Sequence, residues 1–121
     1  PARLVRMAAN EMEVIPGEMI PLSYNQITIG SNPAADLRLD DPSVSSLHAR
    51  LHGTAAGDFI LNDAGSIAGT WVNFNPVSSL GVQLKQGDLI HFGRVAFRFE
   101  LRNPGDTPKA VVNPYQDDNL I

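Results

Sequence analysis

Hydrophobic and polar residues alternate with a period of two along most of the chain, which is the pattern of half-buried β-strands. In the segment 26–30, Ile27 and Ile29 fall on one side of the backbone and Thr28 falls on the other. The same alternation recurs in six further segments, 36–40, 48–51, 58–62, 69–73, 87–93 and 94–101. The pattern therefore predicts a succession of short strands that each bury one face.

Glycine, proline and asparagine separate these segments, so turns recur about every 8 to 12 residues, as in all-β sandwiches and barrels. A helical stripe of useful length is absent from the sequence, and the best helix candidate is the segment 7–14, MAANEMEV. The segment 2–8 is expected to form a strand that lies partly at a sheet edge. Large aromatic residues on alternating strands usually fill the core, so Trp71 and Phe97 are expected there.

The chain of 121 residues is long enough for a single domain with its own hydrophobic core. We expect the domain to cover residues 1–101 and a tail or linker to cover 102–121, because the last segment carries three prolines and few large apolar residues. Because the chain begins with Pro1 rather than methionine, we expect it to be a piece of a longer protein.

Composition and charge narrow the possible partners. The sequence has no cysteine, so disulfides and thiolate zinc sites are excluded. Nine basic residues stand against thirteen acidic ones without a basic cluster, which disfavours nucleic acids and anionic membrane surfaces as partners. Apolar runs stay far below the roughly 20 residues that span a bilayer. We therefore expect a cytoplasmic location.

The segment 40–51, DDPSVSSLHARL, places three serines ahead of His48 and raises the question of catalysis. A serine nucleophile needs a base, an acid and an oxyanion hole, and the G-x-S-x-G elbow that presents such a serine is absent. His48 and His52 would lie about 13 Å apart on a strand, too far to share a metal ion. We expect no enzymatic activity, no metal and no cofactor.

Seven short motifs follow one another between Ile27 and Phe99, and their order closely resembles that of the forkhead-associated (FHA) domain. They are T-I-G, D-L-x-L, V-S-x-x-H-A, F-x-L-x-D-x-G-S, G-T-x-V-N, L-x-x-G-D-x-I-x-F-G and F-x-F. The resemblance implies a β-sandwich of about eleven mostly antiparallel strands. It also implies a non-catalytic interaction module whose loops form a pocket for phosphothreonine peptides.

The resemblance assigns two groups of residues. The candidates for phosphopeptide binding are Ser31, Asn32, Ser45, Ser46, Ala68 and Gly69. The residues expected to support the loops are Gly30, His48, Asp63, Thr70 and Asn73. In particular, His48 is expected to brace a loop through its ring, and Asp63 is expected to cap the turn at Gly65 and Ser66.

The candidate pocket departs from the family pattern at several positions. Ser31 stands where the family has an arginine that grips the phosphate, and Ala68 stands where it has an asparagine that holds the peptide backbone. Ser46 replaces a stronger donor, and Ile67 replaces a residue that is often polar. Between residues 31 and 79, two arginines face five aspartates. Both arginines, Arg38 and Arg50, are expected to point outward from their strands and not to replace the missing arginine.

Two functional hypotheses follow from these departures. The first is an FHA-type interaction module whose phosphothreonine binding is weak or lost, and whose loops or sheet face contact a protein partner or another domain of the parent chain. The alternative is a working phosphothreonine reader that relies on Ser45, Ser46 and loop backbone amides, since a nest of amides holds an anion without arginine.

Overall fold

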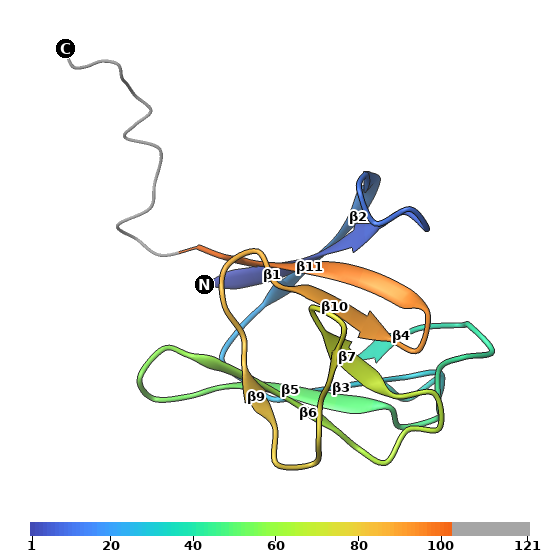
Figure 1. The fold of residues 1–121 in the computed structure, drawn as a ribbon. Helices are drawn as coiled ribbons and strands as arrows, with labels where there is room; N and C mark the ends of the chain where they lie inside the picture. The colour runs from blue at the N-terminus through green and yellow to red at the C-terminus, as the bar shows by residue number, and fades with distance from the viewer. Residues whose placement is uncertain (103–121) are drawn as a thin grey trace, which may run out of the picture.

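The computed structural model describes residues 1–102, which form two β-sheets that face each other (Figure 1). The first sheet has the strand order β2-β1-β11-β10-β7-β8, and the second has the order β4-β3-β5-β6-β9. Within these residues the eleven strands are β1 (Ala2–Met7), β2 (Val14–Leu22), β3 (Ile27–Gly30), β4 (Leu37–Arg38), β5 (Ala49–Gly53), β6 (Phe59–Asp63), β7 (Thr70–Val72), β8 (Asn75–Pro76), β9 (Val82–Gln83), β10 (Leu89–Phe92) and β11 (Val95–Leu101). Only β3 and β4 pair in parallel there, so the predicted sandwich of mostly antiparallel strands is confirmed.

The core lies between the two sheets and follows the alternation of the sequence. Val95, Phe97 and Phe99 of β11 are all buried, and Leu51 of β5 and Leu61 of β6 meet them from the other sheet. Full burial of each such side chain stabilises the fold by about 1.5–3 kcal/mol. The sandwich is therefore held by its inward-facing positions.

Trp71 does not fill the core, so that prediction was wrong. Thr70 and Val72 of β7 point inward and are buried, and the residue between them must face outward. The Trp71 ring lies half-buried on the outer face, where its indole N–H donates to the Ala68 carbonyl at 3.3 Å. The position of Trp71 follows from strand alternation and not from the size of its side chain.

The N-terminal segment also differs from the sequence expectation. The helix candidate 7–14 is a turn between two strands, β1 and β2. β1 is not an edge strand, because it pairs with β2 on one side and with β11 on the other. The edge position belongs to β2, which tolerates Pro16 and Pro21 because one of its sides has no neighbouring strand.

Four connections meet at one end of the sandwich, at the right of Figure 1: β3–β4, β4–β5, β6–β7 and β10–β11. Backbone N–H groups join them, from Ala64 to the His48 carbonyl at 2.9 Å and from Gly93 to the Gly69 carbonyl at 2.9 Å. The strand β11 ends at Leu101, and the expected tail lies outside the described residues. The division into a domain and a tail therefore stays a prediction. In the part of the chain that the structure describes, no helix has the length and apolarity that a membrane crossing needs.

Candidate recognition site

The candidate binding residues come from three connections that lie against one another. The Ser31 N–H donates to the Ser45 carbonyl at 3.0 Å, and the Asn32 N–H donates to the Ser46 carbonyl at 3.2 Å. The third connection, between β6 and β7, contacts the other two through Ile67, whose N–H donates to the Ser45 hydroxyl oxygen at 3.1 Å. We call the segments 31–32, 45–46 and 67–69 the recognition loops.

His48 holds the recognition loops together from below. Its Nδ1 accepts the Ser45 N–H at 3.1 Å, so the ring proton belongs on Nε2, which donates to the Gly69 carbonyl at 2.9 Å. The side chain is completely buried. Because both ring nitrogens are engaged in these backbone contacts, His48 is a structural brace and is not placed to act as a base for a serine hydroxyl.

Two glycines allow the close approach of these loops. A Cβ atom on Gly30 would lie 2.0 Å from the Ser46 carbonyl oxygen, which is part of the backbone and has little room to move. Gly69 has a φ of +92°, a conformation that favours glycine, and a Cβ there would meet the Trp71 indole. Side chains at these two positions would push the recognition loops apart.

Asp63 organises the β6–β7 connection. Its carboxylate accepts the hydroxyls of Ser66 and Thr70 and the N–H groups of Gly65 and Ser66. Partial burial raises the pKa of Asp63, but these hydrogen bonds favour the charged form and lower the pKa below its ordinary value of 3.8. The ionised Asp63 therefore fixes the turn from which Ile67 and Ala68 project.

Asn73 lies at the other end of β7, away from the recognition loops. It has a φ of 50°, and its side chain accepts the Leu89 N–H at 3.0 Å and donates to Asp88 at 2.9 Å. These contacts fix the tight turn between β7 and β8. Asn73 supports the sheet and does not belong to the recognition loops.

The side chains at the loop surface differ in what they offer to a ligand. The Ser45 hydroxyl oxygen accepts the Ile67 N–H, and within residues 1–102 its own O–H donates to no protein acceptor. Ser46 and Asn32 are exposed beside it. Ile67 is 97% exposed and Ala68 is also exposed, so the third loop presents an apolar tip. The surface therefore combines a few neutral donors with apolar groups.

Arg38 is exposed, as the strand pattern predicted, but its head group also contacts the first recognition loop. Its Nε donates to the Ser31 carbonyl at 3.2 Å, and an Nη lies 3.9 Å from an Asp40 oxygen. Strand alternation fixes the direction of a Cβ, but three methylene groups let an arginine head group reach back across the chain. The guanidinium therefore borders the first recognition loop.

The count of two arginines against five aspartates leaves out Arg94, which pairs with one of these aspartates, Asp41. Asp41 binds the N–H and hydroxyl of Ser43 and the guanidinium of Arg94, and these groups lower its pKa from the ordinary value. Asp36 accepts the Thr28 N–H at 2.8 Å. Sequence reasoning missed Arg94 because it lies 53 positions from its partner.

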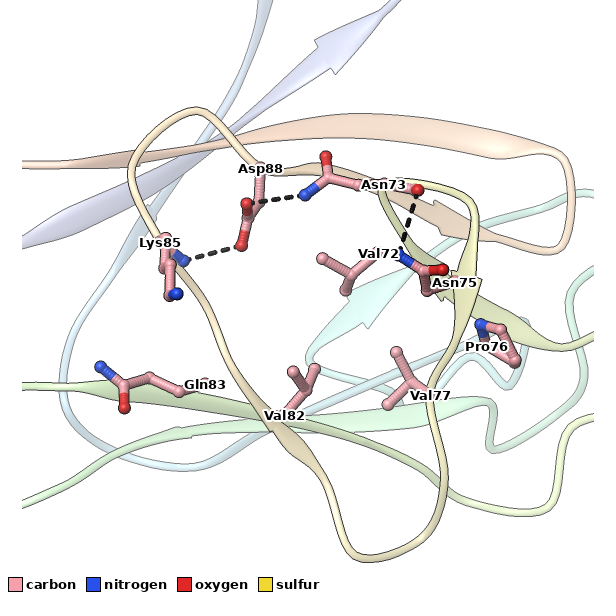
Figure 2. A pocket seen from close by; sticks show the side chains of 9 residues that line it. All are labelled: Val72, Asn73, Asn75, Pro76, Val77, Val82, Gln83, Lys85 and Asp88. Atoms are coloured by element: carbon pink, nitrogen blue, oxygen red, sulfur yellow. Dashed lines mark hydrogen bonds between the residues drawn. The ribbon is translucent and has the colours of Figure 1, made fainter.

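A hollow of about 230 Å³ lies away from the recognition loops, between the edge strands β8 and β9. Figure 2 shows Val72, Val77 and Val82 turned toward its middle. We call it the edge hollow, and its lining consists of Val72, Asn73, Asn75, Pro76, Val77, Val82, Gln83, Lys85 and Asp88. Its carboxylate is already engaged, because Asp88 accepts the Lys85 N–H at 2.7 Å as well as the Asn73 amide. The edge hollow combines an apolar middle with the side-chain amides of Asn75 and Gln83 and the Lys85 ammonium in its lining.

Comparisons with known proteins identify the family. The model of the FHA domain matches residues 27–93. The glycogen accumulation regulator GarA of Mycolicibacterium smegmatis is 38% identical over 85 residues, which are 69% of this chain and 51% of that protein. The chain thus spans about half the length of this curated relative.

Solved structures agree with the family. An FHA domain studied for phosphothreonine-dependent interactions is 26% identical and superposes with a TM-score of 0.70, over 84% of this chain and 97% of that one. Mycobacterium tuberculosis EmbR, solved with a low affinity phosphopeptide, is 28% identical with a TM-score of 0.69, over 82% of this chain and 24% of that one.

The chain therefore belongs to the FHA domain family. FHA domains are interaction modules that bind phosphothreonine peptides of partner proteins, and they are not catalytic. The predicted fold, the predicted family and the absence of enzymatic activity are confirmed by this assignment.

Proposed function

We propose that this FHA domain binds a phosphothreonine segment of a partner protein at the recognition loops. The observation that carries the proposal is the position of the Ser45 hydroxyl, which is held by the Ile67 N–H and keeps its own proton for a ligand. Ser46, exposed next to it, adds a second hydroxyl, and the exposed Asn32 side chain adds an amide. This arrangement matches the needs of a phosphate group with three acceptor oxygens.

We further propose that the affinity is lower than in family members with the full set of pocket residues. Ser31 supplies one neutral donor where the family pattern has a charged fork of five N–H groups, and Ala68 supplies none where it has an amide. Hydrogen bonds to charged groups contribute about 1.5–3 kcal/mol, so the loss corresponds to about tenfold or more in affinity.

The test is a titration of a degenerate phosphothreonine peptide library and its unphosphorylated twin at low salt. We expect a preference for the phosphorylated set that Ser45→Ala abolishes. The double change Ser31→Arg with Ala68→Asn should strengthen that preference about tenfold or more, because it returns a charged donor and an amide. Equal binding of both libraries by the unchanged domain would overturn the proposal.

A second candidate function rests on the apolar tip of the recognition loops. Ile67 is 97% exposed and Leu47 is also exposed, at a place where a phosphate reader gains nothing from aliphatic groups. These side chains favour a protein surface that binds without phosphate, on a partner or on another domain of the parent chain. Retained binding of a partner after phosphatase treatment, with loss on Ile67→Asp, would favour this second function.

The proposal extends to the setting of the domain. The related GarA is named as a regulator and is about twice as long as the matched region, which supports a regulatory partner protein or a second segment of the same protein as the ligand. We propose a cytoplasmic location, as expected from the sequence.

A further inference from the structure

A phosphate group carries a charge of about −1.5 to −2, and the recognition loops hold only neutral donors at the positions that the family pattern assigns. A cation from another part of the domain would supply the positive charge that these positions lack. Arg38 lies closest to these loops among the arginines whose contacts are seen. Its Nε donates to the Ser31 carbonyl at 3.2 Å, and Ser31 in turn donates to Ser45 at 3.0 Å.

The fold places Arg38 beside the first recognition loop by strand pairing. β4 runs parallel to β3, with Arg38 opposite Gly30, the residue immediately before Ser31. The Leu39 N–H donates to the Gly30 carbonyl at 2.9 Å and locks this register. The backbone of Arg38 therefore lies beside the backbone at position 31, which carries an arginine in the family pattern.

The present partners of Arg38 leave its head group available. One contact uses Nε and a neutral carbonyl, which leaves the Nη groups for a second acceptor. The other is a loose pair with Asp40, at 3.9 Å, in which the side chains are 47% and 85% exposed. Exposed pairs of this kind contribute little to stability, so a doubly charged phosphate can displace the carboxylate.

The neighbouring arginines are less suited to this role. Arg94 is engaged by both oxygens of Asp41, at 3.1 and 3.2 Å. Arg50 is the second residue of β5, where it is paired with Thr28 of β3 and Asn62 of β6. Within residues 1–102, Arg38 is the arginine that hydrogen-bonds to a recognition loop.

We propose that Arg38 is the phosphate-binding cation of this domain and replaces, from β4, the arginine that is missing at position 31. The inference rests on the proposed function. The guanidinium turns from Asp40 to the phosphate and donates through its Nη groups, while Nε stays on the Ser31 carbonyl. Asp40 then acts as a competitor for the site in the unbound domain.

The test measures fluorescence anisotropy with the tightest phosphothreonine peptide from the library and its unphosphorylated twin. Arg38→Gln should weaken phosphopeptide binding about tenfold, since it removes charge-assisted hydrogen bonds. Arg50→Gln is the matched control, which removes the same charge from the same sheet, and should change the affinity by less than about twofold. Asp40→Asn should strengthen binding a few-fold because it removes the competitor.

A rescue variant separates a binding role from a structural one. Adding Ser31→Arg to Arg38→Gln should restore the affinity, because the cation then returns at the usual family position. Thermal unfolding of each variant checks that the exposed substitution leaves the fold intact. If Arg38→Gln behaves like Arg50→Gln while Ser45→Ala still abolishes binding, the proposed function stands and the role of Arg38 is refuted. If the unchanged domain shows no preference for phosphate, the proposed function fails, and the role of Arg38 fails with it.

Discussion

The recognition loops and the edge hollow differ in almost every property that marks a binding site. The edge hollow has volume, about 230 Å³, and a floor of three valines. The recognition loops instead present the hydroxyls of Ser45 and Ser46, and the Arg38 guanidinium borders them. A phosphate is recognised by donors and charge rather than by apolar enclosure. The proposed function therefore places the binding site at the recognition loops rather than in the edge hollow.

The largest expected effect is a loss of stability when His48, the brace of the recognition loops, is removed. His48→Ala leaves the Ser45 N–H without its partner, removes one of the two donors to the Gly69 carbonyl, which keeps the Gly93 N–H, and opens a cavity. A buried unpaired group costs about 1–3 kcal/mol and the cavity adds to this cost, so we expect a loss of roughly 3 kcal/mol or more in the free energy of unfolding. Urea unfolding measures this loss of stability. His52→Ala, in the adjoining strand β5, is the control and should cost much less, and equal losses would contradict the assigned role of His48.

A smaller but distinct effect is expected from glycines at the two ends of the sandwich. Gly30→Ala forces a Cβ against the Ser46 carbonyl, so it should lower both the stability and the phosphopeptide affinity. Gly87→Ala, in a turn away from the loops, meets no atom within 4 Å and has a φ of +85°. It should cost only about 1–2 kcal/mol for the left-handed conformation and leave binding unchanged. Unfolding curves and anisotropy titrations together distinguish the two outcomes.

The loop end should also determine part of the acid sensitivity. The pKa of Asp63 is lower in the folded domain than its ordinary value of 3.8, so the ionised carboxylate favours the folded state. This contribution is fully present above the unfolded pKa, near pH 4, and is lost as the pH falls through the lower folded pKa. Asp63→Asn should flatten this acid limb in urea unfolding measured from pH 7 to pH 2. An unchanged slope would show that Asp63 does not carry this dependence.

The smallest effect is expected at the edge hollow. Lys85→Gln removes its cation without touching the recognition loops, so the affinity for a phosphothreonine peptide should stay within about twofold. Anisotropy titrations of Lys85→Gln and Arg38→Gln are compared directly, because both variants lose one positive charge and differ only in its place on the domain. A loss as large as that of Arg38→Gln would mean that the peptide extends into the edge hollow.

Parts of the fold were predictable because they depend on local alternation. The buried faces of β5 and β11 follow directly from residues spaced two apart, and the motif order gave the family. Trp71 was predicted in the core because of its size, although strand alternation with the buried Thr70 and Val72 places it on the outer face. The strand β2 was not predicted because prolines argue against a central strand. An edge strand tolerates them, since it pairs on one side only.

The sequence alone determined the sandwich, the family and the loop positions of Ser31, Ser45 and Ala68, because strand periodicity and turn residues act over a few neighbouring positions. Only the tertiary structure decided which groups meet. The pairing of Asp41 with Arg94 and the brace from His48 to Gly69 join segments 53 and 21 positions apart, and the contact of Arg38 with Ser31 crosses the connection between β3 and β4. Such contacts depend on the register between strands and on the reach of long side chains, and neither is written in the local pattern.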